Sequence, residues 1–304
     1  MLGMTACGGG KPASAPAAQS SGPAAQSTEP AVSGSAPAQE GKRAILVVSF
    51  GTSYNESRTA TIGAIEKAVT DAFLDFEVRR AFTSQTIINK LKTRDNEQID
   101  NVGEAMNRLV ADGVKTLVVQ PTHVMNGFEY DDMVTEVTPF KEKFDAFSIG
   151  APLLSSDADY AEMANILMAE TASYNVDKTA VVFMGHGTEH AANATYAKLD
   201  GIVKATEGAK NYHIGTVEAE PGLEEVMAEV AGTDATRVVL LPLMIVAGDH
   251  ANNDMAGDEE DSWKTKFKGE GYEVECVLKG LGEYERIQKM FVAHTQDAVD
   301  ALGK

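Results

Sequence analysis

The stretch AILVVSFGT at residues 44–52 occurs again, in related form, as AVVFMGHGT at residues 180–188. Each copy is a continuous apolar run that ends in Gly-Thr, a pattern typical of a buried parallel strand and the turn that follows it. With Gly51 aligned on Gly187, His186 stands where the first copy has Phe50. The repeat therefore predicts one α/β unit that is used twice, with a histidine at this turn in the second unit only.

A second pair of apolar runs supports the same repeat. LVVQP at residues 117–121 resembles VVLLP at residues 238–242, and a Gly follows each Pro at residues 127 and 248. An Asp-Met pair comes next in both copies, at residues 132–133 and 254–255, and in this register His250 stands opposite Glu129. One fold used twice, with one half carrying metal-competent histidines, predicts a two-lobed enzyme with a cleft between the lobes.

Apolar β-rich runs alternate with helical patterns along the chain. Strands are expected at residues 44–49, 76–81, 115–120, 146–149, 179–184, 211–217, 237–244 and 272–278. Apolar residues at helical spacing predict helices at 56–73, around 102–110, and at 160–172, 223–230 and 284–302. Such alternation implies right-handed βαβ units. The sequence therefore predicts the α/β class, with two similar Rossmann-like lobes, each a four-stranded parallel sheet flanked by helices.

Composition divides the chain into three expected segments. Residues 1–41 are mostly Ala, Pro, Ser, Gly and Gln. Such a segment buries too little apolar surface to offset the entropy lost on ordering, so a disordered tether is expected. The lobe boundary is expected in Ser173–Lys178, before the second Gly-Thr copy. This gives an N-terminal lobe at 42–173 and a C-terminal lobe at 174–304 that carries the metal site.

The tether begins with MTACGGG at residues 4–10, which looks like a bacterial lipobox, with small residues before a Cys and a Gly-rich linker after it. It predicts a lipid on Cys7 that tethers the protein to a membrane, and a lipid-anchored or periplasmic location. The alternative is a chance cysteine in low-complexity sequence and a cytoplasmic protein.

The formal net charge is −19, and nearly all of it lies after residue 41. This charge argues against nucleic acid as a partner. It suits attraction of divalent cations and disfavours a polyanionic ligand. The turn at residues 49–53 fits neither G-x-G-x-x-G nor G-x-x-x-x-G-K-[ST], so no nucleotide is expected.

Three metal-competent side chains of the second lobe follow expected strands. His186 follows 179–184, Glu218 follows 211–217, and His250 follows 237–244 after a short loop. Ligands of open parallel sheets bind at the carboxyl ends of the strands, so these groups should share one rim. Two imidazoles and a carboxylate suit Co²⁺, Ni²⁺, Fe²⁺ or Zn²⁺. Each residue alone also fits a polar loop position, and Glu220 lies close enough to replace Glu218.

The other histidines fall into two groups. His123 follows a strand of the first lobe and is placed to face the cleft from the other side, and His190 lies one turn past His186. His213, inside a strand, and His294, in the last helix, fit structural roles better than ligand roles.

With these residues in hand, the chain closely resembles the anaerobic sirohydrochlorin cobaltochelatases of the CbiK type, which are relatives of ferrochelatase. The resemblance covers residues 42–304. It rests on the motifs VVSFGTS (47–53), AFTS (81–84), QPTH (120–123), GHGT (185–188), AGDHANNDM (247–255) and GLGE (280–283).

The resemblance implies two similar α/β lobes around a tetrapyrrole cleft, and ATP-independent insertion of Co²⁺ into sirohydrochlorin, or its relative precorrin-2, in anaerobic cobalamin biosynthesis. The two metal-binding histidines of the family map onto His186 and His250, and its glutamate onto Glu218, with Glu220 as the alternative. His186 is expected to be both ligand and base. Substrate-binding residues are expected at the cleft: Phe50, Gly51, Thr52, His123 and Gly187.

Other functions stay open at this point. One is an exported tetrapyrrole- or metal-binding protein that kept the cleft without turnover; another is a chelatase for Fe²⁺ or Ni²⁺. A sugar- or ion-binding lipoprotein of the transport type would not explain the paired histidine motifs. The expected partners are a tetrapyrrole and a divalent metal, and a homo-oligomer is compatible with the sequence.

Overall fold

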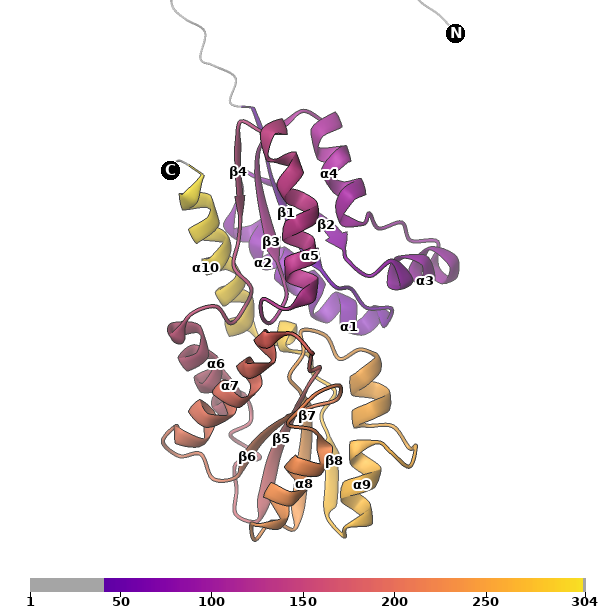
Figure 1. The fold of residues 1–304 in the computed structure, drawn as a ribbon, viewed down its shortest axis with the longest axis vertical. Helices are drawn as coiled ribbons and strands as arrows, with labels where there is room; N and C mark the ends of the chain where they lie inside the picture. The colour runs from indigo at the N-terminus through magenta and orange to yellow at the C-terminus, as the bar shows by residue number, and fades with distance from the viewer. Residues whose placement is uncertain (1–40, 303–304) are drawn as a thin grey trace, which may run out of the picture. The chain divides into compact units, whose positions relative to one another are not determined.

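A computed structural model describes residues 41–302 and contains two four-stranded sheets, both entirely parallel. The first has the strand order β2-β1-β3-β4 and the second the order β6-β5-β7-β8 (Figure 1). The predicted fold class is therefore confirmed. The strands are β1 (Lys42–Ser49), β2 (Glu77–Phe82), β3 (Val114–Pro121), β4 (Ala146–Ile149), β5 (Thr179–Gly185), β6 (Tyr212–Thr216), β7 (Arg237–Pro242) and β8 (Glu273–Cys276).

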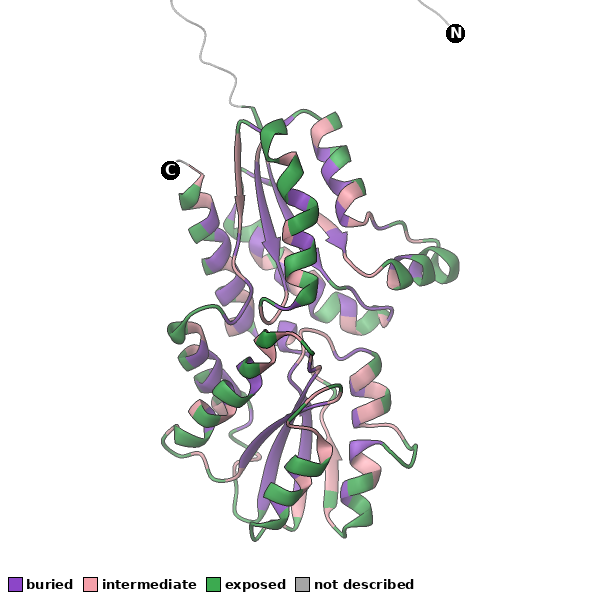
Figure 2. Cartoon of the chain, viewed as in Figure 1, coloured by how far each residue is buried: buried purple, intermediate pink, exposed green. Residues whose placement is uncertain are grey.

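Helices cover both faces of the first sheet. Alternate residues of β1 face opposite ways, so Leu46 packs toward α4 (Val102–Ala111) and α5 (Phe128–Val137), whereas Val47 packs toward α2 (Ile62–Ala72) and α10 (Glu285–Ala301). Figure 2 shows the central strands buried between these helices. Two-sided burial is the reason why β1 reads as a continuous apolar run.

The second sheet is built in the same way. Val182 of β5 packs toward α8 (Leu223–Ala231) and α9 (Trp263–Gly269), and Val181 packs toward α6 (Asp157–Glu170) and α7 (Ala194–Ala205). The two lobes therefore share strand order, strand direction and two-sided helical cover.

Two helices cross the lobe boundary expected at residues 173/174. Helix α6 precedes that boundary, yet it packs in the core of the second sheet. Helix α10 follows it, and its C-terminal end packs on the first sheet, where Ser148 donates a hydrogen bond to the Ala298 carbonyl (2.7 Å). The division at 42–173 and 174–304 therefore needs correction at both helices. Helical periodicity gives a helix an apolar face but does not say which sheet that face covers.

The helix predicted at 56–73 is two helices, α1 (Asn55–Ala60) and α2, which are separated at Thr61. Helices α5, α7, α9 and α3 (Gln85–Asp95) are additional to the helices expected from the sequence. In α3 the buried residues are only Ile88 and Leu91, and most other positions are polar. The short turns η1 (Thr138–Lys143), η2 (Ala191–Asn193), η3 (Ala251–Met255) and η4 (Leu281–Glu283) complete the described elements.

The tether predicted at residues 1–41, including Cys7, lies outside the described residues apart from Gly41. Within residues 41–302, every helix is too short or too polar to cross a membrane.

Candidate active site

The repeated Gly-Thr turns adopt the same backbone conformation. Gly51 follows β1 with φ = 100°, and Gly187 follows β5 with φ = 86°. Both values are favourable only for glycine. A Cβ on Gly51 would come within 2.6 Å of the Phe82 ring, and one on Gly187 within 2.7 Å of the Ala219 nitrogen. Conformation and space thus require glycine at both turns.

Backbone hydrogen bonds around the turns show which residues correspond. The amide of Ser84 donates to the Phe50 carbonyl (3.2 Å), and the amide of Glu218 donates to the His186 carbonyl (2.8 Å). Glu218 therefore occupies the second-lobe position that Ser84 occupies in the first lobe.

The third strand ends correspond in the same way. Thr122 donates to Val48 (2.8 Å), and Leu243 donates to Met184 (2.7 Å). Counting on seven residues from Thr122 and from Leu243 leads to Glu129 and His250, the register that the sequence repeat predicts.

The structure brings His186, Glu218 and His250 together. The three residues follow β5, β6 and β7, which are neighbours in the second sheet, and one ligand atom from each lies within 4.8 Å of the others. The carboxylate of Glu218 lies 3.6 Å from His186 Nδ1 and 3.8 Å from His250 Nε2. The imidazole rings are 4.7 Å apart at an angle of 85°. All three side chains are at least partly exposed, so an ion has access to them.

Hydrogen bonds orient both imidazoles. His250 Nδ1 lies 2.7 Å from the Asp254 carboxylate, and the π-helical turn η3 places these residues four apart on one face. An ionised carboxylate can only accept, so Nδ1 carries the proton and the Nε2 lone pair faces Glu218. His186 Nδ1 lies 2.8 Å from the Gly187 carbonyl, which likewise favours a lone pair on Nε2. Partners of this kind fix the tautomer and orientation of metal-binding histidines.

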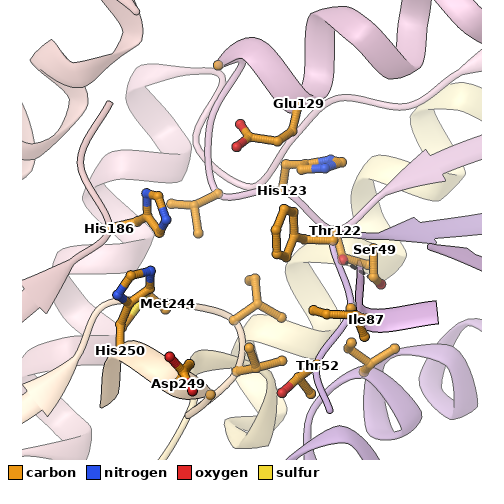
Figure 3. Close-up of a pocket in the computed structure, with 18 of the residues that line it drawn as sticks. Ser49, Thr52, Ile87, Thr122, His123, Glu129, His186, Met244, Asp249 and His250 are labelled. Atoms are coloured by element: carbon orange, nitrogen blue, oxygen red, sulfur yellow. Dashed lines mark hydrogen bonds between the residues drawn. The ribbon is translucent and has the colours of Figure 1, made fainter. Parts of the chain in front are cut away.

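A cavity of about 470 Å³ lies beside these histidines and is lined by both lobes (Figure 3). Its volume is within the range of small-molecule sites. Phe50 is 49% exposed, unusually high for a large aromatic residue, and it lines this cavity. The cavity wall includes every residue predicted to bind substrate: Phe50, Gly51, Thr52, His123 and Gly187.

Glu220, the alternative to Glu218, does not join the cluster of potential ligands among the described residues. It is exposed, and its carbonyl accepts a hydrogen bond from Asn193 Nδ2 (2.7 Å). The two acids are close in sequence but only Glu218 faces both histidines.

His123 lines the cavity on the first-lobe side, across from His186 and His250 in Figure 3. Its residue is partly exposed, but both ring nitrogens are buried and have no hydrogen-bond partner among the described residues. Burial lowers the pKa of His123 to about 4, although the Glu129 carboxylate opposes that shift. His123 is therefore a neutral part of the cleft wall at physiological pH.

The remaining histidines have partners outside the cluster. His190 lies 3.4 Å from Asp131 and packs edge-on against Phe128, both of α5, so it joins the two lobes. His213 bonds Glu229 (2.7 Å) within the second lobe, and His294 bonds Asp159 (3.1 Å). The last two are structural, as their sequence positions predicted.

The structure places two further residues beside the site, where sequence reasoning did not put them. Asp254 lies four residues after His250 on a helical turn, and this spacing was a usable signal for its contact with the imidazole. Lys90 of α3 lines the cavity, and nothing in the local sequence indicates that α3 borders the cleft.

The chain is similar to proteins of known activity. A model of the cobalt chelatase (CbiK) family matches residues 43–300. The chain is 41% identical over 259 residues to the sirohydrochlorin cobaltochelatase of Salmonella typhimurium, covering 85% of this chain and 97% of that protein. It is 33% identical over 263 residues to the sirohydrochlorin cobaltochelatase CbiKC of Nitratidesulfovibrio vulgaris, covering 86% and 92%. The solved structure of SirB from Bacillus subtilis with Fe³⁺ has the same fold, with a TM-score of 0.61 at 14% identity over 86% of this chain and 98% of that one.

Proposed function

The chain belongs to the cobalt chelatase (CbiK) family, and on that premise we propose that it inserts Co²⁺ into sirohydrochlorin without a nucleotide. The observation that carries the proposal is the convergence of His186, Glu218 and His250 beside a cavity that both lobes line. Family membership supports the reaction, and the geometry supports the assignment of residues to it.

In the proposed reaction the second lobe holds the ion first. Two imidazoles and one carboxylate leave coordination positions open, as in sites that exchange ligands, whereas closed tetrahedral sites retain their metal. Asp254 keeps the His250 ring turned toward Glu218. The site can therefore bind Co²⁺ and also release it.

The macrocycle then occupies the cavity between the lobes. The Phe50 ring offers an apolar face to it, and the Gly51 and Gly187 turns keep the cavity free of side chains at the two strand ends. This position brings the pyrrole nitrogens toward the ion from the first-lobe side.

Metal insertion requires that two pyrrole N–H protons leave as the four ring nitrogens bind Co²⁺, so the two charges of the ion replace those of the two protons. A neutral imidazole can accept a proton near pH 7. The Nε2 lone pair of His186 becomes free when the ion moves into the macrocycle, and His186 then takes a proton. Glu218 and solvent are placed to take the second.

The test is an absorbance assay of the purified chain with sirohydrochlorin and Co²⁺, Fe²⁺ or Ni²⁺ in separate reactions. We expect a new metal-complex spectrum at a rate above the protein-free reaction, with Co²⁺ the best metal, and no effect of added ATP. His213→Gln, a histidine outside the cluster, is the matched control for His186→Gln. Binding of sirohydrochlorin without any faster insertion would instead support a tetrapyrrole-binding protein.

We also propose, from the MTACGGG motif alone, that Cys7 is lipidated and anchors the protein outside the cytoplasm. Metabolic labelling with a fatty acid should mark the wild-type chain and not Cys7→Ser. Equal labelling of both, or of neither, would contradict the anchor.

A further inference from the structure

A second cavity, of about 810 Å³, adjoins the one beside the histidines. Both cavities are lined by Ser53, Tyr54 and Lys90, so they share a boundary at these residues. The second cavity also has walls from both lobes, since Arg94 comes from α3 and Asn252 from η3. The proposed reaction centre therefore has a lateral extension that the metal site does not explain.

Lys90 has the only unpartnered positive charge at this boundary. It is the single lysine or arginine that lines the first cavity among the described residues. Its side chain is exposed and makes no ion pair or hydrogen bond with any residue in the 41–302 range. A flexible ammonium group with no protein partner is available to an anionic ligand.

The neighbouring arginines are already engaged. Arg94, one turn further along α3, donates to the Asp95 carboxylate (2.6 Å) and to the Ser53 carbonyl (2.7 Å). Arg58 is buried and pairs with Glu97 (2.5 Å). These guanidinium groups hold the 53–55 loop and its surroundings, so they position the boundary and leave Lys90 as its free cation.

The substrate of the proposed function carries many carboxylates on the rim of its macrocycle, whereas this chain has a net charge of −19. A macrocycle in the first cavity must place some of its rim toward the boundary with the second. An ammonium there offsets repulsion by the protein and pairs with a carboxylate that has lost part of its hydration.

We propose that the second cavity receives carboxylate side chains of the tetrapyrrole and that Lys90 binds them at the boundary. The inference rests on the proposed function. Lys90 is then a specificity residue, because it favours heavily carboxylated macrocycles over those with few carboxylates. Glu56 lines the same cavity, is exposed and has no partner among the described residues, so it works against such a ligand.

Lys90 and Glu56 carry opposite charges, so their removal should change KM for the tetrapyrrole in opposite directions. Lys90→Gln should raise KM for sirohydrochlorin roughly fivefold, the upper range expected for one solvent-exposed ion pair, with little change in kcat. Glu56→Gln should lower KM. The control is Lys92→Gln, on the same helix and outside both cavities, which should match wild type. The Lys90→Gln effect should shrink as salt is added, because salt screens the ion pair.

The same variants can be titrated with metal-free sirohydrochlorin, which measures affinity without turnover. Weaker binding by Lys90→Gln and tighter binding by Glu56→Gln would support the inference, whether or not the wild-type chain inserts Co²⁺. Failure of the wild-type chain to insert Co²⁺ would overturn only the proposed function. Unchanged affinity in Lys90→Gln and Glu56→Gln, or equal losses of affinity in Lys90→Gln and Lys92→Gln, would overturn the inference. The proposed function would still stand if the wild-type chain inserted Co²⁺ in the absorbance assay. Thermal unfolding of each variant checks that the exposed substitutions leave the fold intact.

Discussion

The two lobes have the same scaffold and different chemistry. Their sheets have equivalent strand orders, and both Gly-Thr turns have positive φ at the glycine. Just after equivalent strands the first lobe has Phe50 and Ser84 where the second has His186 and Glu218. In the register of the sequence repeat, Glu129 of the first lobe corresponds to His250 of the second. The backbone thus sets where a side chain at a strand end points, and the residue type sets what that position can do.

The surroundings of the equivalent residues differ as well. Ser84 caps α3 by accepting a hydrogen bond from the Ile87 amide (3.4 Å), so its oxygen serves the fold. Glu218 is exposed and lies between two imidazoles. The comparison leads us to expect that the second lobe binds the ion and the first provides the wall for the macrocycle, a division of labour that can be tested one lobe at a time.

The largest effect is expected for His186→Ala. Loss of a ligand should weaken Co²⁺ binding by about an order of magnitude or more. Loss of the base should lower kcat by roughly 10²- to 10⁴-fold. Calorimetry and the absorbance assay measure the two effects separately. Wild-type values for both would remove His186 from the site and leave Glu218 and His250 as the residues that distinguish the second lobe.

The histidine of the first lobe should act on stability instead. Its pKa of about 4 lies below the ordinary value of about 6.5, so the unfolded chain binds a proton between these pH values and the folded chain does not. The free energy of unfolding should therefore be highest above pH 6.5 and fall as the pH drops toward 4. The His123 contribution to this fall is at most about 3 kcal/mol, the free energy that corresponds to the difference between the two pKa values.

Urea unfolding at pH 7 and pH 5 measures this slope in wild type and in His123→Gln. The variant should lose part of the slope. The pKa of His213 is also lowered by burial, but His213 is present in both proteins and contributes equally to both slopes. The difference between the two slopes therefore reports on His123. Parallel curves for the two proteins would show that His123 does not titrate in this way.

Asp254→Asn sharpens the assignment of the second lobe without removing a ligand. The amide keeps the shape of the side chain but weakens the hydrogen bond that orients His250. We expect roughly tenfold weaker Co²⁺ binding, typical of residues that orient metal ligands. Asp258→Asn is the control, because Asp258 lies four residues after Asp254 but pairs with Lys264 (2.7 Å) and not with a histidine. Equal effects of the two changes would indicate a general charge effect.

Phe50→Ala probes the wall of the first lobe. Removing the half-exposed ring should raise KM for the tetrapyrrole a few-fold, since aromatic contacts contribute about 1 kcal/mol beyond area burial. Co²⁺ affinity should stay at the wild-type value. A collapse of metal affinity would mean that the lobes do not divide the work as expected.

The smallest effect is expected for Phe50→His, which copies the second lobe's residue into the first. A lone imidazole beside Ser84 should not make a second site, so the stoichiometry should remain about one Co²⁺ per chain. Titration of the double variant Phe50→His, His186→Ala makes the test stricter. Recovery of wild-type affinity there would show that one histidine at either turn is sufficient.

The sequence alone determined the features that arise from short-range patterns. All eight strands lie within a few residues of the ranges expected from the sequence. The signal is clearest for the central strands β1, β5 and β7, because a strand buried on both faces must be apolar throughout. The repeat of Gly51 and Gly187 predicted equivalent turns, and strand ends predicted that His186 and His250 lie on one rim.

Tertiary structure decided what depends on contacts between distant residues. Only the folded chain distinguishes Glu218 from Glu220, because the outcome depends on where the loop after β6 turns relative to β5 and β7. The placement of Lys90 at the cleft depends on how α3 packs beside the second lobe. Helix α10 likewise packs partly on the first sheet. Its sequence predicts an apolar face but does not show which sheet that face covers. Local spacing fixes the type and direction of each element, and the burial of apolar faces against partners far along the chain fixes which elements meet.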